Sequence, residues 1–179
     1  MIRIISALFE TYQDAERAVS QLEAANIPNT DISLVTGDVE ASNSFQRDVI
    51  AGTGAGAALG GAGGVLAGLA LLAAPGVGQV VAAGWIAAAL VGATMVAGAT
   101  TGAVVGAGAG SAIGSLTEAG FPRAESHLYA ESLRRGRSLV AARVADDREG
   151  EVRAIFAKFP SLDPSTVRSA YEAEGWTSK

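Results

Sequence analysis

The two ends of the chain place their hydrophobic residues at the spacings of strands and helices. Near the N-terminus, IRIISALF and DISLVT are short runs rich in β-branched and apolar residues, which is typical of strands. Between them, an apolar stripe at helical spacing predicts a helix; it consists of Ala15, Ala18, Val19, Leu22 and Ala25. The N-terminal part therefore predicts the order strand, helix, strand.

The C-terminal part repeats this pattern. SLVAARVA predicts a strand, and a last short strand is expected within STVRSAY. Between them, a second helical stripe consists of Val152, Ile155, Phe156 and Phe159. Its first two residues follow Val19 and Leu22 at a common offset of 133 residues, which is a weak internal repeat. Before the repeat, FPRAESHLYAESLRRGRS predicts a helix that starts near Pro122 and ends before Gly136.

Two strand-and-helix units with a short last strand make a ferredoxin-like α/β sandwich, which is an α+β fold. Neither half has enough strands or apolar surface to be stable alone, so the halves are expected to join. We expect residues 1–48 and 119–179 to be the halves of this domain, split by a long glycine-zipper helical hairpin over residues 49–118.

The segment between the halves carries no charge. From Val49 to Thr117, 69 consecutive residues include no Asp, Glu, Lys, Arg or His. Glycines recur in it at every fourth position in two series, which we call the first and second glycine ladders. They are Gly52, Gly56, Gly60, Gly64 and Gly68, and then Gly98, Gly102, Gly106, Gly110 and Gly114. Glycines four apart line one side of a helix and let another backbone approach closely, so we interpret them as helix-packing and oligomerisation positions.

Two other interpretations of the ladders fail. A phosphate-binding loop requires GxxxxGK[ST] or GxGxxG spacing, and neither occurs in the segment. A flexible linker has Gly with Ser, Thr or charged residues and no fixed period, whereas these glycines recur at every fourth position in uncharged sequence. Between the ladders, Pro75, Gly76 and Gly78 in AAPGVGQ predict the bend of the hairpin.

The two arms of this hairpin differ in length. As a helix, the arm over residues 49–73 spans about 37 Å, enough to cross a hydrocarbon core of about 30 Å. The arm over residues 79–117 spans about 58 Å and is expected to break between residues 92 and 101. A shorter helix is expected around residues 85–90, where Trp85 suits either a membrane interface or packing between helices.

Composition excludes several classes of function. A net charge of -5 gives no reason to expect nucleic acid as a partner, since that requires clustered Lys and Arg. With no cysteine, the chain has no disulfide, thiol catalysis or Cys-type zinc site. Glu10 and Asp14 fall where a signal peptide needs an apolar run, which favours a cytoplasmic location for the α/β domain.

Few residues suggest chemistry. His127 is the one histidine; with Glu125 and Glu131 nearby it makes a poor metal site, and a helix-surface or packing role is expected. The carboxylates in the segment DDREG suit the start of a helix, and no nucleophile accompanies them as an acid/base pair. We therefore expect no catalytic residue, no metal and no cofactor.

A basic cluster follows at the end of the helix predicted before the second half. Arg134, Arg135 and Arg137 are candidate contacts for anionic lipid headgroups beside a membrane. The alternative is a solvated cluster, because cations are favoured at the C-terminal end of a helix.

The order of these features resembles a known family. The uncharged segment with APGVGQ at its bend, the run GFPRAESHLYAESLRRG and the closing EGW are similar to bacterial general stress or heat-induced proteins of the YflT type, also described as 17M-like. That resemblance implies association with stress and a glycine-zipper segment inserted in a small α/β domain. It implies no established catalytic residues, and Arg137 replaces a glycine frequent at this position in the family.

These observations favour a non-enzymatic, stress-associated structural protein. In the first interpretation its glycine-zipper helices self-associate in or on a membrane, with the hairpin in the bacterial inner membrane and the α/β domain in the cytoplasm. Its partners are then copies of itself and membrane lipid. The second interpretation is a soluble homo-oligomeric particle in the cytoplasm, with a shared apolar interior that holds lipid or another apolar guest. The third is a membrane-anchored α/β module that senses a ligand.

Overall fold

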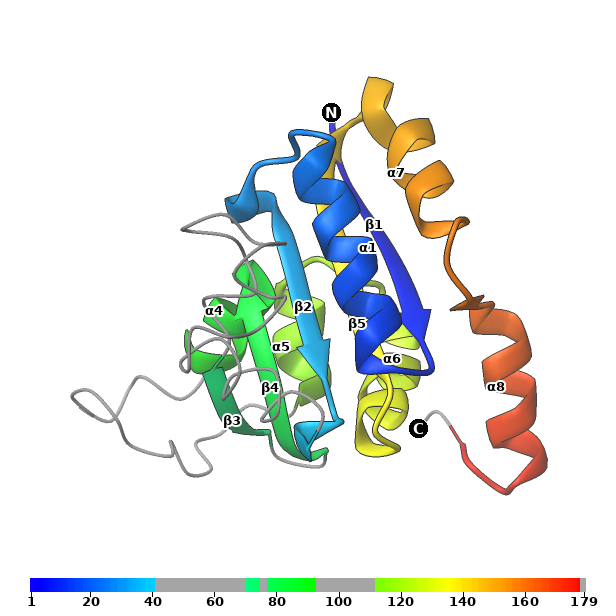
Figure 1. The fold of residues 1–179 in the computed structure, drawn as a ribbon. Helices are drawn as coiled ribbons and strands as arrows, with labels where there is room; N and C mark the ends of the chain where they lie inside the picture. The colour runs from blue at the N-terminus through cyan, green and yellow to red at the C-terminus, as the bar shows by residue number, and fades with distance from the viewer. Residues whose placement is uncertain (41–69, 75–76, 93–111, 178–179) are drawn as a thin grey trace.

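A computed structural model describes residues 1–40, 70–74, 77–92 and 112–177 of the chain. These residues form an α+β protein around one antiparallel sheet of six strands in the order β3-β4-β2-β5-β1-β6 (Figure 1). The strands are β1 Ile2–Phe9, β2 Ile32–Thr36, β3 Ala70–Ala74, β4 Gly78–Gly84, β5 Ser138–Ala145 and β6 Ser161–Leu162. The α-helices are α1 Tyr12–Ala24, α4 Trp85–Gly92, α5 Ala112–Glu118, α6 Arg123–Arg134, α7 Glu149–Phe156 and α8 Pro164–Ala173. Short 3₁₀ turns, η1 Asn29–Asp31 and η4 Asp146–Arg148, precede β2 and α7.

The N-terminal and C-terminal halves join in one sheet, as expected. β1 pairs with β5 along its whole length, from Ile2 opposite Ala145 to Phe9 opposite Ser138. β2 pairs with the other side of β5. The predicted strands IRIISALF and SLVAARVA coincide with β1 and β5, and β2 lies within DISLVT.

One face of the sheet is covered by α1 and α7, the two helices that the repeated apolar stripes predict. α1 crosses the front of the sheet in Figure 1 and contacts α7 as well as β1, β2 and β5. Val19 and Leu22 of α1 and Val152 and Ile155 of α7 lie in the same buried cluster. The internal repeat therefore reflects two helices that share one core.

The other face is covered by α4, α5 and α6, a second helical layer that the sequence did not predict. Its core contains side chains of the β-strands and of residues just before and just after the end of the uncharged segment. These include Leu116 of α5, Phe121 and Tyr129. The predicted helix before β5 is confirmed as α6, which begins after Pro122 and ends before Gly136, where φ is +83°.

The prediction of a helical hairpin is wrong for the residues around its bend. Residues 70–74 and 78–84 are strands β3 and β4, which pair antiparallel from Ala70 opposite Ala82 to Ala74 opposite Gly78. The predicted bend therefore joins strands. Gly78 begins β4 with φ of +104°, whereas Pro75 and Gly76 lie outside the described residues.

Serine and glycine fix the junction between β4 and α4. The Ser33 hydroxyl donates to the Ala83 carbonyl oxygen at 2.6 Å and accepts from the Ile86 amide at 3.1 Å. Gly84 has φ of +81°, and a Cβ there would lie 2.1 Å from the Ile32 carbonyl oxygen. This close approach of β2 turns the chain from β4 into the expected helix around residues 85–90, which is confirmed as α4.

The expected last strand in STVRSAY is wrong. Those residues lie in α8, and the last strand is the two-residue β6, which pairs with Leu8 and Phe9 of β1. The Asp163 carboxylate accepts hydrogen bonds from the amides of Ser165 and Thr166, and Pro164 takes the first helical position. Asp followed by Pro is a helix-start signal, and here it stops the strand and starts α8.

Candidate functional site

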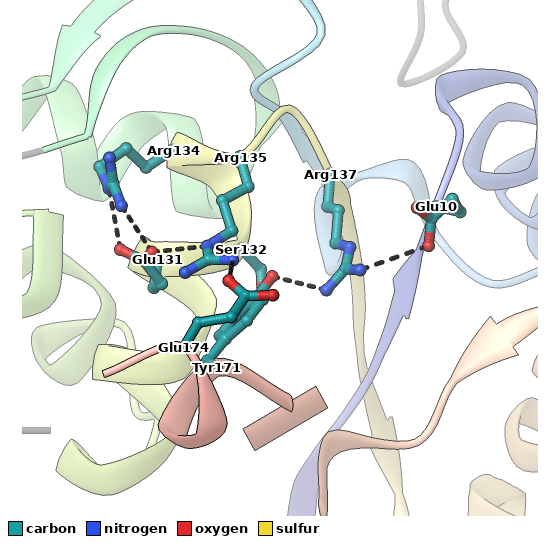
Figure 2. Close-up of polar contacts among 8 residues, drawn as sticks. All are labelled: Glu10, Glu131, Ser132, Arg134, Arg135, Arg137, Tyr171 and Glu174. Atoms are coloured by element: carbon teal, nitrogen blue, oxygen red, sulfur yellow. Dashed lines mark hydrogen bonds and ion pairs between the residues drawn. The ribbon is translucent and has the colours of Figure 1, made fainter. Parts of the chain in front are cut away.

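The predicted basic cluster lies where α6 ends beside α8, and each of its arginines faces a carboxylate (Figure 2). Arg134 donates two hydrogen bonds to Glu131, at 2.8 and 2.6 Å. Arg135 donates to Glu131 at 2.6 Å and also to Glu174, beyond the end of α8. Arg137 lies 3.5 Å from Glu10, at the end of β1. Three positive charges therefore face three negative ones.

Tyr171 of α8 lies between two of these arginines. Its hydroxyl accepts from Arg137 at 2.5 Å and donates to Ser132 at 3.3 Å. The guanidinium carbon of Arg135 lies 3.9 Å from the centre of the Tyr171 ring, a cation–π contact. These contacts hold α8 against α6, and they use hydrogen-bond donors that a lipid phosphate would need. The lipid-headgroup interpretation of the cluster stays a prediction.

Glu131 is the buried member of the cluster, with 8% of its side chain exposed. The hydrogen bond from Arg134 holds the pKa of Glu131 below its usual value; burial opposes this effect, and Arg135 reinforces it. Because the ionised form is favoured by folding, Glu131 stabilises the protein above its unfolded-state pKa. This stabilisation is lost as the pH falls through the lowered pKa of the folded state.

We expect Glu131→Gln to lower the free energy of unfolding by about 1.5 kcal/mol or more at pH 7, the size of a hydrogen bond to a charged group. The difference from the original protein is expected to shrink as the pH falls below about 4.3, the usual pKa of Glu in the unfolded chain, and to vanish below the lowered pKa of folded Glu131, where that side chain is uncharged like Gln. Urea unfolding at several pH values measures it. Glu151→Gln is the matched control, because Glu151 also pairs with an arginine three residues away but is 45% exposed. A pH dependence equal in the Glu131 and Glu151 variants would contradict the role of Glu131.

Sequence reasoning missed the acidic and aromatic members of this cluster. Glu131 precedes Arg134 and Arg135 by three and four residues, the spacing of ion pairs on a helix, so a signal for it was present. Tyr171 and Glu174 lie 34 and 39 residues from the arginines they contact, and no local pattern indicates such pairs. Tyr171 and Trp176 pack with Leu128 in a small cluster beneath α8.

The glycine ladders lie mostly outside the described residues. Of the ten ladder positions, Gly114 is described; it is a half-buried residue of α5. The others, at 52–68 and 98–110, are not described, so their role in helix packing stays a prediction.

The described parts of the uncharged segment pack against the rest of the protein. Val81 and Ala83 of β4 belong to the core beneath α1 and α7, and Ile86 and Leu116 belong to the core of the opposite face. The Trp85 ring stacks on the Phe121 ring, with 5.9 Å between the ring centres. The Arg143 guanidinium lies 4.9 Å from the centre of the Trp85 ring. Of the two roles expected for Trp85, packing is the one observed. Across the described ranges, no helix combines the length and apolar character that a membrane crossing requires.

The remaining candidates for chemistry are dispersed. His127 lies half-buried on α6, and Asp146 forms an ion pair with Arg3 at 2.6 Å just before α7. Glu149 begins α7 and pairs with Arg153 at 2.8 Å, in line with its expected place at a helix start. Among the described residues, no three His, Asp or Glu side chains gather as metal ligands.

A comparison with known protein families gives a match that covers most strands of this sheet. Residues 5–82 match the family model of the heat induced stress protein YflT domain. The chain carries a YflT-type domain. The match confirms the resemblance to YflT-type proteins over these residues, which run from β1 through α1, β2 and β3 into β4 and so include the paired strands β3 and β4. The glycine zipper that the resemblance implies stays a prediction. No curated protein and no solved structure matches the chain significantly.

Proposed function

We propose that this YflT-type protein is a non-enzymatic, stress-associated structural protein that self-associates through its glycine ladders. Association with stress follows from the family. The ladders supply the packing surface, because each glycine removes a side chain that would keep two helices apart. A subunit with ten such positions in uncharged sequence offers a surface that lone soluble proteins rarely expose.

This proposal rests on one observation, the position in the fold of the described elements that border the ladders in the chain. The first ladder ends two residues before β3, and the second begins six residues after α4 and reaches α5. β3 pairs with β4, α4 packs on β2 and β4, and α5 packs on α4. Both ladders are therefore anchored at the same end of the sheet, where they can meet each other or the ladders of another copy.

The scaffold that presents them is, we propose, a ferredoxin-like unit with a β-hairpin added. β1-α1-β2 and β5-α7-β6 supply the two halves, and these four strands lie in the order β2-β5-β1-β6, all antiparallel. β3 and β4 extend the sheet beyond β2.

We favour burial of the ladders against protein, as in the soluble-particle interpretation, over burial in lipid. The support is that Val81, Ile86 and Leu116, from the same uncharged segment, are fully or almost fully buried within their own subunit. Membrane embedding is the second candidate, and the 69 uncharged residues are its support. Flotation of a cell lysate separates them: the favoured proposal predicts large particles that remain soluble without detergent, and embedding predicts co-flotation with lipid.

Replacing Gly60 and Gly106 together by leucine is expected to weaken self-association at least about tenfold, or about 1.4 kcal/mol, because the new side chains separate the packed helices. Light scattering after size exclusion measures the mass of the particle. Gly150→Leu is the matched control, since Gly150 lies in helix α7 and a Cβ there meets nothing within 4 Å. An unchanged particle mass in the double variant would contradict the proposal.

A further inference from the structure

Among the strands that the structure describes, none pairs with the outer edge of β1 over most of its length. β5 covers one edge from Ile2 to Phe9, but β6 covers the other only at Leu8 and Phe9. Natural sheets blunt such edges with proline, bulges or unpaired charge. The open stretch of β1 has no proline, and its one charged side chain, Arg3, is engaged by Asp146 and Glu149.

The pairing pattern shows which backbone groups face outward. The Asp146 amide donates to the Met1 carbonyl oxygen at 3.2 Å, so the odd-numbered residues of β1 direct their backbone groups toward β5. Even-numbered residues direct theirs outward, and the pairing of Leu8 with Leu162 of β6 agrees. The N–H and C=O groups of Ile2, Ile4 and Ser6 therefore face the open edge, and nothing in the described part of the chain bonds to them.

This edge lies in a groove between the two helical layers. A cavity of about 350 Å³ adjoins β1 near the connection from α5 to α6, and one of about 280 Å³ adjoins it between α7 and β6. The charged side chains along the first cavity balance, with Arg3 and Arg153 against Glu125 and Glu149. Ile2 at its rim is 76% exposed.

We propose that β1 pairs antiparallel with β1 of a second copy, about a twofold axis at Ile4. In this register Ile4 faces the partner's Ile4, and Ile2 faces the partner's Ser6. Each of these pairs exchanges two hydrogen bonds, so all outward groups of Ile2, Ile4 and Ser6 are satisfied in both copies. A register shifted by two residues pairs Ile2 with the partner's Ile4 and leaves Ser6 without a bond.

A second copy is the occupant that this edge fits best. The chain is acidic, with a net charge of -5, and repels itself at long range, but the groove is locally neutral. The register also sets Ile4 against its own counterpart and covers Ile2, so apolar contact accompanies the hydrogen bonds. This contact does not involve β3, β4 and α4, the elements next to the ladders in the chain, which lie toward the opposite end of the sheet.

Cross-linking tests the register, because the chain has no cysteine of its own. In Ile4→Cys, the two introduced thiols lie on Cα atoms about 5.5 Å apart, within the 4.4–6.8 Å that a disulfide spans, and mild oxidation is expected to give mostly covalent dimer. Ile2→Cys is the matched control. Its two Cα atoms are more than about 13 Å apart, although Ile2 is the more exposed residue and random collision would favour it.

A mixture of Ile2→Cys and Ser6→Cys proteins supplies a second measurement if Ile4→Cys fails to fold. Residues 2 and 6 face each other, so only the mixture is expected to cross-link, and neither variant alone. Repeating the experiment in the Gly60→Leu, Gly106→Leu background separates the two contacts, since the cross-link is expected to persist when the ladder contact is lost. No cross-link at position 4 and none in the mixture, or cross-linking as strong in Ile2→Cys alone, would overturn the proposal.

Discussion

Replacing Gly37 by alanine is expected to lower the free energy of unfolding by about 3 kcal/mol or more, the upper range for an overpacked site. Gly37 follows β2 and its amide donates to the Arg137 carbonyl oxygen at 3.0 Å. A Cβ at this position would lie 1.7 Å from the carbonyl oxygen of Leu133 and 2.8 Å from its carbonyl carbon. These are backbone atoms at the end of α6, so no side chain can turn aside. The β2 end and α6 must move apart.

Urea unfolding followed by circular dichroism measures this change. Gly150→Ala is the control, because Gly150 is a helical glycine with open space where its Cβ would stand. It is expected to raise the stability by about 0.5–1 kcal/mol, since alanine restricts the unfolded chain and favours helix. Equal effects of the two substitutions would show that the contact between Gly37 and α6 does not limit the packing.

The second large effect is expected from Val81→Asp in β4. Val81 is fully buried, facing the core beneath α1 and α7, and lies in the uncharged segment. An unpaired carboxylate there is expected to lower the free energy of unfolding by about 4 kcal/mol or more, a large part of the about 5–15 kcal/mol that a domain possesses. Fluorescence of Trp85, which stacks on Phe121 nearby in the fold, reports the unfolding.

Gln79→Asp introduces the same carboxylate two residues earlier in the same strand, where the side chain is exposed. It is expected to change stability by less than about 0.5 kcal/mol. The comparison decides whether this part of the uncharged segment is core. A Val81→Asp protein as stable as the original would place the segment outside the fold that β1, β2 and β5 share.

The strands and helices in the charged parts of the chain could be predicted from the sequence, whereas the strands inside the uncharged segment could not. α1 and α7 show clear helical stripes, and β1 and β5 end where their apolar runs end. β2 is also buried at every residue, but its β-branched run follows the turn and Asp31; in β4, Val80 to Ala83 show no alternation and no charged residue marks where the strand begins or ends. A continuous run of small apolar residues is compatible with strand or helix. The ladders on both sides then favoured helix throughout, and β3 and β4 were missed.

The second helical layer was missed for a related reason. α4 has apolar residues on all sides and α5 has seven residues, so neither shows an apolar stripe long enough to indicate which face it covers. α6 was predicted with both ends correct, from Pro122 and Gly136, but its packing partners were not. Their identities depend on contacts such as Phe121 with Trp85, which join segments separated by the second ladder.

The position of the candidate site could be predicted from the sequence, but the side chains that surround its arginines could not. Arginines at a helix end were found from the sequence, and their pairing with Glu10, Glu131 and Glu174 reverses the impression of a positive surface. A cluster of arginines in the sequence does not show which carboxylates the fold will bring next to it from distant parts of the chain.

The strand order has a consequence for how copies add to one another. β3 and β6 are the two ends of the sheet; the first ladder is followed along the chain by β3, and the open stretch of β1 lies beside β6. If both proposed contacts form and each joins one other copy, a subunit is divalent, and its assemblies are expected to have no fixed stoichiometry and a mean length that grows with protein concentration. A variant that keeps a single contact acts as a chain terminator. Mixing it with the original protein would shorten every assembly in proportion to the amount added.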